Sequence, residues 1–320
     1  MTTSRRARTA ALFASLSLAA LGLSCSNDNA ATSNPATDTA DTVVATTAPA
    51  PELPTVVVTY SVLAAVVSEL VDGVANVVAL IPDGQDPHDF QPSAKDIETI
   101  NNAALVVSNG LEFEEGLEEV LENIADSGGN IFMVGDHITV RKIEDGDEHS
   151  DEHTGGDPHL WLSPATMLEM LPALTTALSE ATGADLSAEA TDLTTKLQVL
   201  DGEVESIIKS LDECKLVSGH DEMGYFADRY GCEVIGVIIP SFTTTSEATA
   251  GELAELKKLV EQNKVPAIFT GLGVSPDTAT QLAKELGIKA VMLSTHYLDG
   301  AANYQEFILK LTNQIAEALG

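Results

Sequence analysis

Two kinds of apolar pattern alternate along this chain from residue 55 onward. Short runs of β-branched and apolar residues, such as Val56-Val57-Val58 and Ala104 to Val107, alternate with stretches in which apolar residues recur every three or four positions. The first pattern is typical of buried strands and the second of amphipathic helices. A regular alternation of the two predicts an α/β fold with mostly parallel sheets.

The predicted strands and helices form two series. Strands are expected near residues 56–58, 77–81, 104–107 and 131–134, with helices near 62–71, 93–100 and 114–125. A second series has strands near 214–217, 233–238, 267–269 and 289–293, with helices near 221–230, 248–262 and 275–286. We therefore expect two Rossmann-like lobes, an N-terminal lobe over residues 55–186 and a C-terminal lobe over residues 213–320.

One long helix, over residues 187–212, is expected to join the lobes. Its apolar residues alternate at steps of three and four: Ala190, Leu193, Leu197, Leu200, Val204, Ile207 and Leu211. Ser187 is the expected N-cap. Two α/β lobes joined in this way leave a cleft between them, and ligands of open α/β sheets bind beyond the carboxyl ends of the strands.

The N-terminus has the pattern of an export signal. Arg5, Arg6 and Arg8 precede an uncharged apolar run over residues 10–23, which predicts a signal peptide over residues 1–25. The run is too short to span a membrane. Ser24-Cys25 ends an imperfect lipobox, so we expect lipidation of Cys25.

Residues 26–54 are rich in Ala, Thr, Asn, Asp and Pro and have no apolar period, so they are expected to be a disordered tether. Together with the lipid anchor, this places the protein at the outer face of the cytoplasmic membrane or in the periplasm.

The charge of the chain narrows the choice of partner. Its 49 acidic and 16 basic residues give a formal net charge of −33. This charge disfavours nucleic acids and anionic membrane surfaces and favours a cation as ligand, although it is also what solubility alone would need. We expect a monomer that is held to the membrane only by its lipid.

Four of the seven histidines follow predicted strands or repeat a motif. The motif Asp-Pro-His-x-aromatic occurs twice, at His88 and at His159. His220 follows the strand at 214–217, and His296 follows the one at 289–293. A single histidine of this kind is more often a loop or capping residue, but four in similar positions predict one metal site. Imidazoles suit zinc, whereas manganese prefers carboxylates; copper and nickel would also accept imidazole.

These motifs resemble those of a known family, the zinc and manganese solute-binding proteins of metal-importing ABC transporters, of the ZnuA and TroA type. The matching segments are Asp86-Pro87-His88 with Phe90 and Pro92-Ser93, Asn109-Gly110-Leu111, Asp157-Pro158-His159 through Pro164, and His220 through Tyr230. The resemblance implies a metal held between two lobes by His88, His159 and His220, with the permease and ATPase subunits of an importer as partners. In that family a histidine at the third position is typical of zinc proteins, so we expect Zn²⁺ rather than Mn²⁺ as the transported ligand.

The fourth ligand is where the chain departs from the family. The family usually has an Asp after the last strand, and here the segment reads His296-Tyr297-Leu298. This alignment makes His296 the fourth ligand. Asp299 is the rival, Ser294 would match if the alignment slips by two, and water could instead complete a three-histidine shell.

Residues 144–157 form an acidic insert that carries His149 and His153. The insert resembles a short form of the loop rich in His and acidic residues in zinc-type relatives, and it would be a secondary metal site that raises the local metal concentration. An ordinary exposed loop has the same composition. His137 is assigned no role.

Cys214 and Cys232 remain once Cys25 is assigned to the lipid. In an exported protein, two such cysteines favour a disulfide over free thiols. Each precedes a predicted strand, so adjacent parallel strands would bring them together. Thiolate ligation of the metal is the alternative, but these strand ends lie opposite the strand exits.

Other function classes share part of this pattern. A Mn²⁺ or Fe²⁺ binder of the same family, a metal chaperone and an exported zinc hydrolase would all need clustered ligands. The chain has no His-Glu-x-x-His motif, no apparent nucleophile elbow and no Gly-rich phosphate loop. The sequence therefore favours high-affinity binding and delivery of a metal over catalysis.

Overall fold

The computed structural model describes residues 52–142 and 155–320, which belong to one compact unit. Its first sheet has four parallel strands in the order β2-β1-β3-β4. The strands are β1 (Thr55–Tyr60), β2 (Asn76–Ile81), β3 (Leu105–Ser108) and β4 (Ile131–Met133). Val57 in β1 pairs with Val78 on one side and Val106 on the other. Val56, Val57 and Val58 are fully buried, as expected of a central parallel strand that is covered on both faces.

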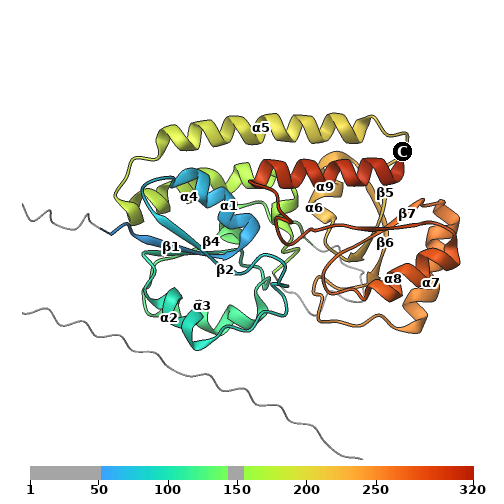
Figure 1. The fold of residues 1–320 in the computed structure, drawn as a ribbon, viewed down its shortest axis with the longest axis horizontal. Coiled ribbons are helices and arrows are strands. Elements are labelled where there is room, and N and C mark those ends of the chain that lie inside the picture. Colours follow the sequence, from blue (N-terminus) through green and yellow to red (C-terminus); the bar gives the residue numbers. More distant parts are fainter. Residues whose placement is uncertain (1–51, 143–154) are drawn as a thin grey trace, which may run out of the picture. The chain divides into compact units, whose positions relative to one another are not determined.

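Helices cover both faces of this sheet, which confirms the predicted α/β class (Figure 1). They are α1 (Ser61–Leu70) and α4 (Pro164–Thr182) on one face, and α2 (Ala94–Asn101) and α3 (Glu118–Asp126) on the other. Ser93 caps α2 in a reciprocal capping box with Asp96. The predicted helix at 114–125 is a short 3-10 helix, η1 (Glu115–Leu117), that continues into α3.

The second half of the chain holds four more parallel strands. They form two hydrogen-bonded pairs: β5 (Lys215–His220) with β6 (Glu233–Ile239), and β7 (Ala267–Thr270) with β8 (Lys289–Met292). β5 also lies against β7. The helices around them are α6 (Gly224–Tyr230), α7 (Ala250–Asn263), α8 (Pro276–Leu286) and α9 (Tyr304–Leu319). Cys214 and Cys232, next to the starts of β5 and β6, form the predicted disulfide.

The long helix α5 (Ser187–Lys209) runs along both halves of the unit (Figure 1). It buries Leu193, Leu197, Leu200 and Val204, and it packs on α4, α9, α1 and α6. Two of these partners, α4 and α9, were not predicted, and Pro172 inside α4 interrupts the signal that a helix normally gives.

The predicted cap of α5 is wrong by one residue. Ser187 is the first helical residue, and the preceding Leu186 makes no side-chain cap. The Ser187 hydroxyl and N–H instead donate to Oδ1 of Asp185, which precedes the helix.

Within residues 52–142 and 155–320, no helix has both the length and the apolar content that a membrane crossing needs. Cys25 and the two loop histidines, His149 and His153, lie outside the described residues, as do the predicted signal peptide and nearly all of the predicted tether and acidic insert.

Candidate metal centre

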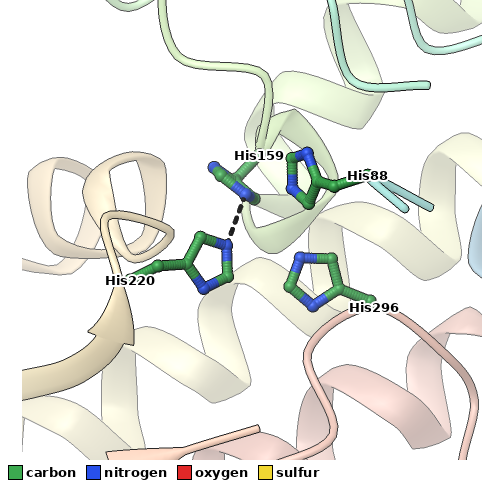
Figure 2. Close-up of side chains that lie close together, drawn as sticks. All are labelled: His88, His159, His220 and His296. Atoms are coloured by element: carbon green, nitrogen blue, oxygen red, sulfur yellow. Dashed lines mark hydrogen bonds between the residues drawn. The ribbon is translucent and has the colours of Figure 1, made fainter. Parts of the chain in front are cut away.

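Four histidine side chains meet in the interior of the molecule (Figure 2). Each offers one ring nitrogen, and these four nitrogens all lie within 4.8 Å of one another. All four side chains are buried, with residue exposures of 1% or less. The residues are the four that the sequence singled out: His88, His159, His220 and His296.

Three of the four occupy the predicted kind of position. His220 is the last residue of β5, and His88 and His296 lie in the loops after β2 and β8. His159 does not follow a strand: it precedes the 3-10 helix η3 (Leu160–Leu162), and the helix η2 (Val134–His137) comes between it and β4. The chain reaches His159 through the Asp157 N–H, which donates to the Arg141 carbonyl, so loop contacts rather than a strand end place this ligand.

The ring nitrogens at the centre of the cluster have few partners. Nε2 of His159 and Nε2 of His220 lie 3.1 Å apart. Both ring nitrogens of His88 and Nε2 of His296 are buried with no hydrogen-bond partner in the described part of the chain. Burial of an unpaired polar atom is costly, so these nitrogens indicate a ligand that takes up lone pairs. A metal cation is such a ligand.

A second layer of polar groups holds the rings. Nδ1 of His159 lies 3.0 Å from Oδ1 of Asp157, which also accepts the His159 N–H at 2.9 Å. Nη1 of Arg141 donates to the other oxygen of Asp157 at 3.4 Å. A side chain at Gly224 would begin 2.4 Å from that oxygen, so glycine is needed there. An acceptor at Nδ1 keeps Nε2 free to ligate, as in carboxylate–histidine–metal triads.

Two more carboxylates face the cluster. Oε1 of Glu115 lies 3.5 Å from Nδ1 of His88, and it accepts a hydrogen bond from the hydroxyl of Thr243 in the second half of the chain. The oxygens of Glu222 lie 3.8 Å from Nδ1 of His220 and 3.8 Å from Nδ1 of His296. The Thr295 hydroxyl is also 2.9 Å from Nδ1 of His296.

Burial decides the protonation of this centre. It lowers the pKa of His220 and of His296 well below the usual value, and the neighbouring histidines lower both further. These two imidazoles are therefore neutral at neutral pH, which is the form that binds metals. The same burial raises the pKa of Asp157 to about 7 and that of Glu222 to about 8.

Aromatic side chains surround the rings and exclude water. Phe113 meets His88 edge-on, with ring centroids 4.9 Å apart, and stacks on His296 at 6.0 Å. Trp161, which is fully buried, lies 5.4 Å from His159 and 5.6 Å from His296. Its Nε1–H donates to the Thr295 carbonyl at 2.7 Å, so the ring joins the first half of the chain to the loop that carries His296.

The other candidate residues lie elsewhere. Asp299 has a side chain that is 44% exposed and forms an ion pair with Lys310. Ser294 is only partly buried. His137 is exposed and stacks on Phe132, with ring centroids 4.4 Å apart.

Sequence reasoning missed the carboxylates Glu115 and Glu222. Glu222 stands two residues after His220 in the His-Asp-Glu segment, so a search for carboxylates beside each predicted ligand would have found it. Glu115 has no such signal, because it meets His88 only through the fold.

Comparisons with known proteins show which family and which fold this chain resembles. A family model described as ZnuA, "Zinc-uptake complex component A periplasmic", matches residues 56–318. The zinc-binding protein TroA of Treponema pallidum is 31% identical over 225 residues, which cover 68% of this chain and 69% of TroA. A solved structure of the periplasmic zinc-binding protein TroA from the same organism superposes with a TM-score of 0.74 at 25% identity, covering 84% of this chain and 99% of that one.

Two further relatives are similar over much of the chain. The zinc-binding protein AdcA of Streptococcus pyogenes serotype M3 is 29% identical over 239 residues, which are 68% of this chain but 46% of AdcA. The chain thus matches about half the length of AdcA. The manganese-binding lipoprotein MntA of Halalkalibacterium halodurans is 24% identical over 238 residues, 73% of this chain and 76% of MntA.

Proposed function

Because the chain belongs to the ZnuA family of periplasmic components of zinc-uptake complexes, we propose that it binds Zn²⁺ outside the cytoplasmic membrane and delivers it to an ABC importer. One observation carries this proposal: four buried histidines present ring nitrogens within 4.8 Å of one another. Four neutral imidazoles match the tetrahedral coordination that zinc prefers. The ligands would be His88, His159, His220 and His296.

The donor set favours zinc over manganese. Mn²⁺ and Fe²⁺ sites in proteins are richer in carboxylate and water, and in this cluster the carboxylates of Asp157, Glu115 and Glu222 face Nδ1 atoms instead. The relative MntA is named for manganese, but we base the choice of metal on the four imidazoles of this chain and not on that name. Cu²⁺ would bind imidazole at least as tightly in the test tube, so selectivity for zinc in the cell would rest on metal availability.

Delivery requires a membrane partner, which we take to be the permease and ATPase subunits of the importer. A lipid on Cys25 and a tether over residues 26–54 would hold a monomer within reach of that permease. The acidic insert with His149 and His153 would be a secondary metal site that raises the local metal concentration. These assignments are proposals on residues that the structure does not describe.

An enzymatic role has less support. A catalytic zinc site keeps one coordination position open for water or substrate, whereas in the proposed site a fourth histidine would fill that position. The family match is to a component of an uptake complex, not to a hydrolase. A free metal chaperone would need the same site but no permease, so transport must be tested as well as binding.

The deciding experiment is a metal measurement on the mature chain. We expect protein purified without added metal to carry one zinc per chain by mass spectrometry, and to prefer Zn²⁺ to Mn²⁺ in competition titrations. Replacing His88, His159 or His220 by Ala should weaken Zn²⁺ binding at least about tenfold. His137→Ala is the matched control, because this histidine lies outside the cluster.

Tighter binding of Mn²⁺ than of Zn²⁺ would overturn the metal assignment. Zinc-dependent growth that is unaffected by loss of the protein, in cells limited for zinc, would overturn delivery while leaving binding intact.

A further inference from the structure

Glu222 is a buried carboxylate beside two of the proposed ligands, and neither sequence motif nor ligand geometry gives it a role. It lies in the turn between β5 and α6, where its N–H donates to the His220 carbonyl at 2.9 Å. The residue is 3% exposed. Its Oε2 is buried with no hydrogen-bond partner in the described part of the chain. A buried carboxyl oxygen in such a place needs a partner, because leaving a buried polar atom unpaired costs free energy.

The two oxygens of Glu222 face two equivalent nitrogens. Oε1 lies 3.8 Å from Nδ1 of His220, and Oε2 lies 3.8 Å from Nδ1 of His296. The two rings are stacked, with centroids 5.1 Å apart and planes 22° apart. Figure 2 shows both rings facing the centre of the cluster. One carboxylate can therefore serve both rings, and a shift of less than about 1 Å would bring both pairs to hydrogen-bond distance.

The charge of a bound Zn²⁺ ion is a reason for a carboxylate to face both rings. Four neutral imidazoles leave the double charge of Zn²⁺ uncompensated inside the protein, whereas a carboxylate ligand would offset part of it. Binding through Nε2 also leaves each Nδ1 with a proton that needs an acceptor. Asp157 is that acceptor for His159, at 3.0 Å. Nδ1 of His220 and Nδ1 of His296 both face Glu222, each at 3.8 Å.

We propose that Glu222 is a positioning residue of the metal centre, which accepts the Nδ1–H of His220 and of His296 at once and supplies the negative charge that an all-histidine shell lacks. This inference rests on the proposed function. The inference also links positions 222 and 296. If residue 296 were a carboxylate that binds the ion directly, a carboxylate at position 222 would not be needed. The rival acceptor for His296 is the Thr295 hydroxyl, 2.9 Å from Nδ1.

A double-mutant cycle on the full mature chain tests the pairing, with Zn²⁺ affinity measured by chelator competition. We expect Glu222→Gln, which keeps size and burial, to weaken Zn²⁺ binding about 10- to 100-fold. In a His296→Asp background the same substitution should cost less than about threefold, because the new ligand carries the charge. A purely structural role would give the same loss in both backgrounds.

Two controls separate the possible failures. Thr295→Val should weaken binding less than Glu222→Gln; the reverse order would make Thr295 the acceptor and overturn the inference. Thermal unfolding of each metal-free variant checks that it folds, and Glu222→Asp provides a second variant that retains the charge and should bind more tightly than Glu222→Gln. If wild type binds zinc but Glu222→Gln binds equally well, this inference fails alone. If wild type binds no zinc, the proposed function fails.

Discussion

The side chain at position 296 decides the charge of the metal centre. The structure buries His296 among the other three histidines and leaves Asp299 on the surface with Lys310. Asp299 also has a left-handed backbone, with φ of 51°. Moving the Asp299 carboxylate into the cluster would break its ion pair with Lys310 and bury its charge, so it is expected to stay at the surface.

Replacing His296 and Asp299 by alanine, one at a time, therefore distinguishes the two candidates for the fourth ligand. We expect His296→Ala to weaken Zn²⁺ binding at least about tenfold, because it removes a ring that offers a nitrogen to the centre. Asp299→Ala should stay within about twofold of wild type, as surface substitutions do. Competition with a zinc chelator measures both. Loss of affinity in the Asp299 variant alone would mean that the carboxylate, not the imidazole, is the fourth ligand.

At the scale of elements, Glu114 joins two strands beneath the site. It follows β3 at the start of η1, and it accepts hydrogen bonds from the Thr59 hydroxyl in β1 and from the N–H of Asn109, the latter at 2.8 Å. Burial raises the pKa of this carboxyl to about 7, and the two hydrogen bonds oppose the shift. The folded chain thus keeps this proton at pH values where the unfolded chain, with a pKa near 4.5, releases it.

The raised pKa of Glu114 makes the free energy of unfolding depend on pH. Stability from Glu114 is fully present below about pH 4.5 and is lost as the pH rises to about 7, a change on the order of 3 kcal/mol. We expect Glu114→Gln to make the unfolding free energy of metal-free protein less dependent on pH in this range. Urea unfolding at several pH values measures it. An unchanged slope would show that Glu114 is ionised in the fold throughout.

The disulfide lies at the opposite end of β5 from the proposed ligand His220, so we expect it to affect stability but not zinc binding. Cys214 lies at the start of β5, whereas His220 ends the same strand. Replacing both cysteines by serine should lower the unfolding free energy by about 3 kcal/mol, because the unfolded chain gains loop entropy. Zinc affinity of the folded protein should not change. Denaturant unfolding and zinc competition on the same preparation check this, with reduced wild type as control; weaker zinc binding without loss of stability would contradict it.

At the scale of the whole unit, hydrogen bonds between its two halves converge on the metal centre. Trp161 donates to the Thr295 carbonyl, Thr243 donates to Glu115, and the Leu298 N–H donates to Asp83 at 2.9 Å. The ring of Trp161 lies close to two proposed ligands, with its centroid 5.4 Å from that of His159 and 5.6 Å from that of His296. We therefore expect metal binding to be coupled to the contacts that hold the two halves together.

Trp161 is the only tryptophan of the chain, so its emission reports this coupling. We expect zinc to change the Trp161 emission and the change to saturate at one equivalent, because the ion fixes His159 and His296 beside the indole ring. His296→Ala should reduce the change, and His137→Ala should not. Fluorescence titration measures it. Emission that does not respond to zinc in wild type would place binding away from this cluster.

Local pattern alone was enough to predict most elements of this fold and the four clustered histidines. Strand and helix periods are properties of short segments, so β1 to β8 and helices such as α5 could be located from them. The histidine motifs are likewise local, and so is the use of cysteine in an exported chain. The fold class, the disulfide and the family followed from these signals.

The folded chain was needed for what depends on distance between remote residues. The sequence named His296 but left Asp299 as a rival, and packing placed His296 in the cluster; packing also brought Glu115 to His88 and set Glu222 beside two rings. The helices α4 and α9, on which α5 packs, were not predicted: Pro172 interrupts the pattern of α4, whereas the buried residues of α9 do follow a helical period that sequence reasoning overlooked. The physical reason that packing was needed is the same for all three side chains of the site: burial and hydrogen-bond partners are shared between segments far apart in sequence, and no local period encodes them.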